Sequence, residues 1–169
     1  MKKVSFFLVL AMMLSLFAGC GSEASVTAPE GTTEELIAKI YENVTVELPL
    51  MTMPVDLNDE FAVSAYTGLN GAESIVEASA SEPMMGSQAY SLVLVRLNDA
   101  QQAETIAQSM FDNIDTRKWI CVEATEKQAA VCGDLVCFIM LDPQYGVTSD
   151  QIIEAFTTVC GGSVGTVIK

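Results

Sequence analysis

Apolar side chains recur along the chain at two spacings, which predict an alternation of helices and strands. Helical spacing places apolar residues three or four positions apart behind a polar capping residue. Four segments are expected to be helices on these grounds, at 33–44, 58–66, 98–115 and 149–160. The second of these has the weakest period, and its limits rest on Asp59 or Asn58 as a cap and Gly68 as a stop.

The residues between these segments are predicted to form strands. Residues 73–85 begin with apolar and polar side chains in alternation, and residues 87–97 are apolar at their centre. Residues 125–142 predict a β-hairpin that turns at Gly133-Asp134. Pro49 and Pro54 predict a loop between the first two helices.

The order of these elements predicts the fold class. It is helix, helix, strand, strand, helix, strand, strand, helix, which an α+β domain accommodates as an antiparallel sheet of about four strands with helices packed on one face. A length of 169 residues is typical of one compact domain with a short extension. Half of the residues are hydrophobic, which suffices for a core.

The N-terminus has the character of an export signal. Lys2 and Lys3 precede an uncharged apolar run of 16 residues, 4–19, whereas a membrane-spanning helix needs about 20 residues. Small residues then lead into Cys20, a pattern that resembles the lipobox of bacterial lipoproteins. In that class of protein the cysteine thiol carries diacylglycerol, and the signal is cleaved just before it. Phe17 stands where the usual pattern has Leu.

This resemblance implies three parts: a signal peptide at 1–19, a flexible tether at 20–32 and a single domain at 33–169. Cys20 would be the lipidation site, and the chain would be held on the extracytoplasmic face of the cell membrane by its lipid. Several acyl chains make such anchoring stable. The alternative is a plain signal peptide or an uncleaved anchor in which Cys20 is incidental.

Charge and composition exclude several kinds of function. The chain has 8 basic and 22 acidic residues, a formal charge of -14, which argues against nucleic acid as a partner. Loss of Lys2 and Lys3 with the signal would make it more negative. There is no His, which removes Ser-His-Asp and Cys-His catalysis and His-ligated zinc. We therefore predict no catalytic residues, no metal site and no cofactor.

Four further cysteines, Cys121, Cys132, Cys137 and Cys160, are candidate disulfide or thiol sites. Across a two-residue turn Cys132 faces Leu135, so Cys137 is a diagonal neighbour at about 7–8 Å. That separation is slightly too long for an unstrained bridge. Two interpretations remain open: buried reduced thiols, or one or more bridges of unassigned connectivity.

Two stretches are candidates for an interaction surface. Arg117, Lys118 and the single tryptophan, Trp119, could form an exposed patch for an anionic or aromatic partner. Alternatively Trp119 covers the edge of the core while the two cations balance a helix C-terminus. Met84 and Met85 could offer an adaptable binding surface, or pack over the sheet.

The stretches "SEPMMGSQAYSLVLVRL", "DTRKWICVEA" and "GDLVCFIML" occur in this order. Together they resemble a family of small Gram-positive bacterial lipoproteins built on a domain of unknown function. The resemblance covers roughly residues 33–156. It implies the same fold and location and carries no catalytic residues.

The sequence thus predicts a lipid-anchored, non-catalytic module of the cell envelope whose partner is a protein or a small ligand. A thiol-dependent enzyme is one alternative, which an exposed cysteine of low pKa beside a cation would favour. The other is a ligand-binding accessory of a transporter, which needs a sizeable apolar pocket with converging polar groups.

Overall fold

The computed structural model describes residues 26–169, so Cys20 and the predicted signal peptide lie outside the described residues. The elements, with η for short 3-10 turns, are α2 (Thr33–Asn43), β1 (Leu50–Pro54), α3 (Glu60–Thr67), β2 (Ile75–Pro83), β3 (Tyr90–Leu97), η2 (Ala100–Gln102), α4 (Ala103–Asn113), β4 (Glu126–Cys132), β5 (Leu135–Leu141), η3 (Pro143–Tyr145), α5 (Ser149–Val159) and β6 (Val167–Ile168). Within this part of the chain none of the helices combines the length and apolar character that a membrane crossing needs.

The strands form one antiparallel sheet in the order β1-β2-β3-β5-β4-β6. The predicted α+β class and antiparallel sheet are confirmed, but the sheet has six strands where about four were expected. The loop expected at Pro49 and Pro54 contains the edge strand β1, and an edge strand tolerates proline. β6 is a two-residue strand on the opposite edge.

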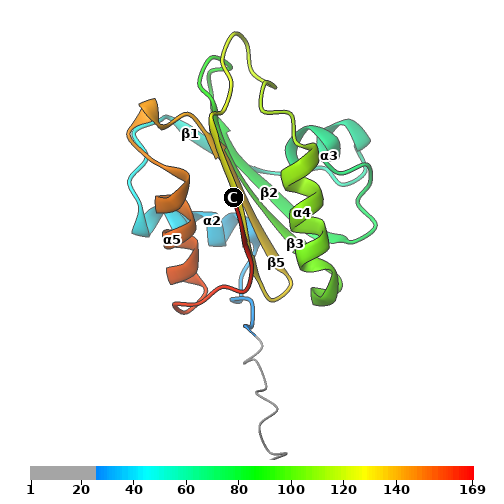
Figure 1. Cartoon of the computed structure of the whole chain (residues 1–169). Coiled ribbons are helices and arrows are strands. Elements are labelled where there is room, and N and C mark those ends of the chain that lie inside the picture. Colours follow the sequence, from blue (N-terminus) through cyan, green and yellow to red (C-terminus); the bar gives the residue numbers. More distant parts are fainter. Residues whose placement is uncertain (1–25) are drawn as a thin grey trace, which may run out of the picture.

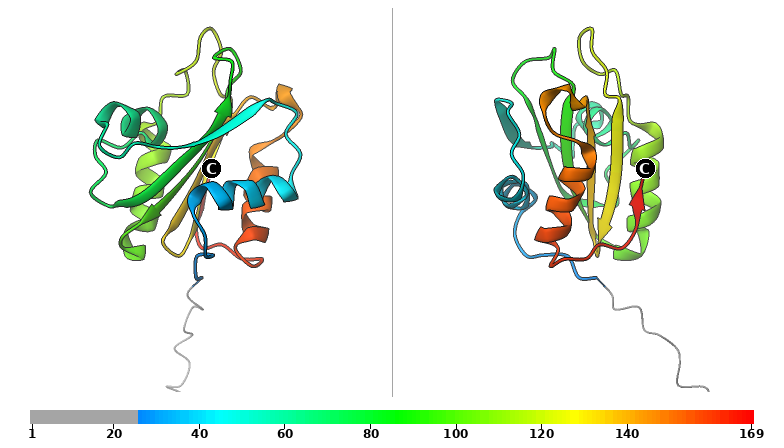
Figure 2. Two further views of the ribbon diagram at one scale, coloured as in Figure 1. Left: turned by 180° about the vertical axis from the view of Figure 1, so that it is seen from behind. Right: turned by 60° about the vertical axis from the view of Figure 1, so that its left-hand side comes forward.

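Helices cover both faces of the sheet, so the expectation that they pack on one face is wrong (Figures 1 and 2). β3 and β5 carry apolar side chains at consecutive positions. Val93, Val95 and Phe138 point into the cluster beneath α3 and α4. Leu92 and Ile139, on the other face, point into the cluster beneath α2 and α5. A strand buried on both faces has a continuous apolar run instead of an alternating one.

Local signals fix where the elements begin and turn. The side chain of Thr32 accepts a hydrogen bond from the Glu35 backbone N–H in a capping box at α2, and Asp59 caps α3. The hairpin turn lies at Gly133-Asp134, as predicted, with Cys132 paired to Leu135. Gly133 has a φ of 60°, a left-handed conformation that glycine adopts without strain.

The hairpin turn also receives the N-terminal end of the described chain. Arg96 donates to the carbonyl oxygens of Pro29 and Gly31 at 3.1 and 3.0 Å, and forms an ion pair with Asp134. A Cβ atom at Gly133 would lie 2.6 Å from the backbone nitrogen of Ala28. Residues 26–31, the later part of the segment in which a tether is expected, therefore run against the domain at this end of the sheet.

A row of polar contacts joins α2 to the sheet beneath it. The Thr33 and Ser79 hydroxyls lie 2.7 Å apart, and Tyr41 donates to Ser81 at 2.9 Å. The Tyr41 and Tyr90 hydroxyls lie 3.2 Å apart. Burial raises the pKa of Tyr41 to about 12, and it raises the pKa of Tyr90 well above its ordinary value. Both tyrosine hydroxyls are therefore neutral in the folded protein at neutral pH.

This row predicts a loss of stability in alkali. The unfolded chain releases the Tyr41 proton near pH 10, whereas the folded protein keeps it to about pH 12. Folded protein then binds more protons than unfolded protein, so the free energy of unfolding falls as pH rises through that window. In Tyr41→Phe we expect the unfolding free energy to depend less steeply on pH between pH 10 and pH 12, because about one proton fewer is released on unfolding. We also expect the variant to be less stable by about 1 kcal/mol at pH 8, where the lost hydrogen bond is the main effect. Urea unfolding at pH 8 and pH 11 measures both, and an unchanged slope in the variant would contradict the assignment.

Candidate functional site

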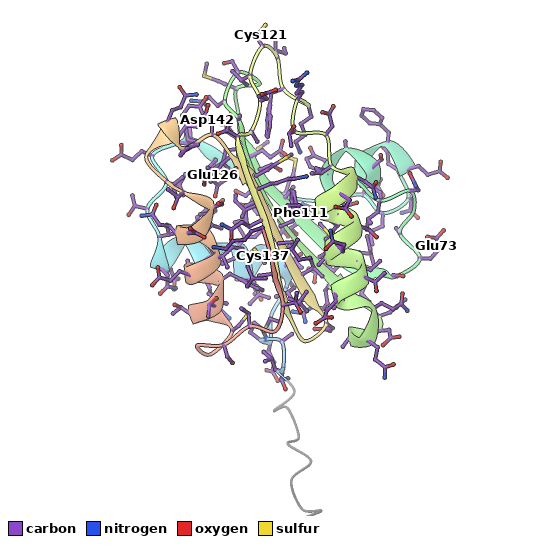
Figure 3. All side chains as sticks on the ribbon, viewed as in Figure 1. Glu73, Phe111, Cys121, Glu126, Cys137 and Asp142 are labelled. Carbon is purple, nitrogen blue, oxygen red and sulfur yellow. The ribbon has the colours of Figure 1, made fainter. Side chains whose placement is uncertain are left out.

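Two loops lie side by side at one end of the sheet, opposite residues 26–31 (Figures 1 and 2). One connects β2 to β3 and spans 84–89, and the other connects α4 to β4 and spans 114–125. The Ile120 backbone N–H donates to the Gly86 carbonyl oxygen at 2.8 Å, which joins the loops directly. Cys121 marks the tip of the longer loop (Figure 3).

The joined loops expose three large apolar side chains. Met84 is 72% exposed, Met85 57% and Ile120 73%. We call this group, Met84, Met85 and Ile120, the paired-loop surface. Clustered exposed apolar side chains are typical of interaction sites, whereas single ones need no explanation. The sequence pattern singled out the two methionines but not Ile120, because only the contact between the loops brings Ile120 to them.

Lys118 does not belong to the exposed surface, although the sequence suggested an Arg117-Lys118-Trp119 patch. Its side chain is 15% exposed and forms an ion pair with Glu82, itself 17% exposed, at 2.5 Å. The Lys118 ammonium also donates to Ser91 Oγ at 3.2 Å and to the Ala65 carbonyl oxygen at 3.3 Å. Burial lowers the pKa of Lys118, and the charge of Glu82 opposes that shift.

Lys118 holds the longer loop onto the body of the domain. Its partners lie on β2, on β3 and on α3, so one ammonium group ties the loop to three elements. The rings of Tyr66 and Trp119 lie 4.9 and 5.5 Å from Nζ and add cation–π attraction. Trp119 is half-buried against the core, as the alternative interpretation expected.

The remaining cations of this region have different partners. Arg117 is exposed and pairs with Glu123 at 2.5 Å. The C-terminus of α4 is served by Lys127, which donates to the Phe111 carbonyl oxygen and lies 4.2 Å from the Phe111 ring centroid. Thus neither Arg117 nor Lys118 balances that helix end.

The four cysteines of the described residues are free thiols. Cys121 is exposed, has a φ of 62° and lies in a hollow of about 310 Å³ beside Arg117. Arg117 is engaged by Glu123, so the hollow offers Cys121 no unpaired cation. Cys132, Cys137 and Cys160 are buried, and Cys137 lies at the centre of the sheet (Figure 3). Burial raises the pKa of Cys137.

Two further observations bear on a small-ligand site and on a metal site. A hollow of about 650 Å³ lies along residues 26–31, and Arg96, which lines it, is already bonded to Asp134 and two carbonyl oxygens. In the chain from residue 26 onward, no three His, Cys, Asp or Glu side chains are grouped so that they could hold a metal ion.

Comparison with protein-family models, with curated proteins and with solved structures gives no match to this chain.

The buried ion pair is expected to be sensitive to loss of one partner. Lys118→Met leaves the Glu82 carboxylate buried without its countercharge, which costs about 3–5 kcal/mol. The double variant Lys118→Met/Glu82→Gln should recover much of that loss, because no buried charge remains. Ser91 Oγ, which donates to Glu82 Oε1 at 2.6 Å, can still donate to the amide oxygen of the glutamine. Urea unfolding measures the stability, and Trp119, the only tryptophan, reports the loop position by its fluorescence.

The exposed pair provides the matched control. Arg117→Met removes a partner of Glu123 in solvent, where an ion pair contributes about 0–1 kcal/mol. Equal effects of Lys118→Met and Arg117→Met would show that the Lys118 pair does not hold the loop.

Proposed function

We propose that this chain is an exported lipoprotein, anchored to the cell membrane through Cys20, whose domain binds a protein partner without catalysing a reaction. The observation that carries the proposal is the paired-loop surface. The two loops that carry its three exposed apolar side chains lie at one end of the sheet, and residues 26–31 lie at the other (Figure 1).

This geometry suits a membrane-anchored module. Only five residues would separate the lipid-bearing Cys20 from residue 26, so the end of the sheet that holds 26–31 would face the membrane. The paired-loop surface would then point away from the bilayer, toward partners in the envelope. In that orientation Met84 and Met85 would not contact the bilayer that holds the anchor.

The chemistry of the surface favours a protein with an apolar recess. Methionine side chains are flexible and polarisable, so Met84 and Met85 can adapt to a partner surface of irregular shape. Ile120 is a β-branched side chain with few conformations to lose on binding. The strongly acidic domain favours a partner with a basic rim, because opposite charges accelerate encounter.

The anchor predicts a specific response to one substitution. Cys20→Ala removes the thiol that would carry lipid, so we expect no incorporation of labelled fatty acid and release from the membrane fraction or blocked processing. Cys121→Ala removes an exposed thiol elsewhere and should retain both the label and the membrane location. Absence of label from the unchanged chain, or a Cys20→Ala variant that is processed normally and still stays at the membrane, would overturn the proposed anchor.

The binding surface predicts contact at defined positions in intact cells. A photoreactive benzoylphenylalanine at Ile120 should form a discrete adduct with a protein partner. The same residue at Phe61, which is 82% exposed on α3, is the matched control and should not. Adding Met84→Ser and Met85→Ser should lower the adduct yield from Ile120 roughly tenfold or more, since burial of each methionine side chain contributes about 1.5–3 kcal/mol.

The adduct formed from Ile120 supports the proposal only if it requires the methionines of the paired-loop surface. Equal adducts from Ile120 and Phe61, or an Ile120 adduct that survives the two methionine substitutions, would exclude the paired-loop surface as the docking site.

A further inference from the structure

Cys132 and Cys160 meet where two elements end. Cys132 is the last residue of β4, before the hairpin turn, and its side chain points toward α5. Cys160 is the C-cap residue of α5, which packs against β4 and β5. Both belong to the core cluster beneath α2 and α5, and their relative exposures are 0% and 9%.

The packing of α5 brings the two thiols to the same end of β4. α5 begins beside the first residue of β4, where Ser149 Oγ donates to the Glu126 carboxylate at 2.9 Å, and it packs along β4, so its last residues lie toward the end of β4 that holds Cys132. The Cys132 thiol also donates to the Thr27 carbonyl oxygen at 3.6 Å. The interaction between the two thiols lowers the pKa of Cys132, against the effect of burial, and raises the pKa of Cys160. Cys132 is therefore the thiol of the pair that ionises first.

The other cysteines are poor partners for Cys132. Cys137 faces Ala130 across the hairpin, two positions from the pairing of Cys132 with Leu135. That diagonal arrangement is too wide for a comfortable bridge. Cys121 is exposed in the α4–β4 loop, at the end of the sheet opposite the hairpin turn (Figure 3).

We propose that Cys132 and Cys160 form a disulfide bond when the chain folds in the presence of a disulfide oxidant, while Cys121 and Cys137 remain thiols. The oxidant is an oxidised thiol–disulfide oxidoreductase or a small-molecule disulfide. The bond would fasten the C-terminal end of α5 to the hairpin turn, beside the segment 26–31 that the same turn receives.

The reaction is two successive exchanges. The thiolate of one of the two cysteines attacks one sulfur of the oxidant, whose S–S bond breaks and releases one half as a thiolate. The thiolate of the other cysteine then attacks the protein sulfur of the mixed disulfide and releases the second half. Two electrons pass from the pair to the oxidant, and the two released thiolates take up the two protons. Because both thiols are covered in the folded domain, exchange precedes final packing.

The bond has a measurable effect on stability. It closes a loop with 27 residues between its ends, which restricts the unfolded chain more than the folded one. The folding equilibrium constant of the oxidised protein should exceed that of the reduced protein roughly a hundredfold or more, seen as a higher urea midpoint. Cys160→Ala should abolish the difference, whereas Cys121→Ala should preserve it.

The bond itself is tested on the full chain in detergent, reduced, unfolded and refolded with oxidised and reduced glutathione. Alkylation under denaturing conditions, followed by peptide mass spectrometry, should recover one linked peptide pair containing Cys132 and Cys160. Recovery of both residues fully alkylated, or of a bridge to Cys137 or Cys121, would overturn the proposal.

A second experiment distinguishes failure of the disulfide proposal from failure of the proposed export. Formation of the disulfide in the cell rests on that export, whereas its formation in vitro does not. Protein extracted from cell membranes is alkylated at once, without refolding. A bond present after refolding but absent from cells supports the pair and counts against an oxidising location. Fatty-acid labelling of Cys20 together with two free thiols after refolding overturns the pair and leaves the anchor standing.

Discussion

Burial of both faces of β3 and β5 is the interaction on which the other elements depend. These strands lie at the centre of the sheet and carry apolar side chains toward both sides. Each face must be covered, and α2 with α5 covers one while α3 with α4 covers the other (Figure 2). With its helices committed to the two faces, the domain leaves the ends of the sheet to loops. The features that bear on function are accordingly at those ends.

The two ends are organised by different chemistry. At one end Arg96 uses neutral carbonyl oxygens and Asp134 to hold residues 26–31 near the surface. At the other, Lys118 pays a desolvation cost to reach Glu82 beneath its own loop. A buried ion pair contributes little net stability compared with an apolar replacement, but it admits few alternative geometries. The α4–β4 loop is thereby fixed against the β2–β3 loop, and Ile120 remains exposed as a consequence.

Local signals in the sequence predicted local structure well, and the failures have a common cause. The cap at Asp59, the stop at Gly68 and the turn at Gly133 were predictable because neighbouring residues decide them. The strand β1 was not, because its formation depends on pairing with β2, which overrides two prolines at its limits. Coverage of both faces was missed for a similar reason, although the run from Leu135 to Leu141 is apolar throughout.

The candidate site was predictable in composition but not in arrangement. Met84, Met85 and Trp119 were identified by residue type, whereas the inward course of Lys118 depends on Glu82, 36 positions earlier in the chain. The thiols follow the same rule. Spacing disfavours a Cys132–Cys137 bridge, yet only the packing of α5 on β4 brings Cys160 to Cys132. Residue type can nominate a functional group, but contacts between distant segments decide whether that group faces solvent, the core or a chemical partner.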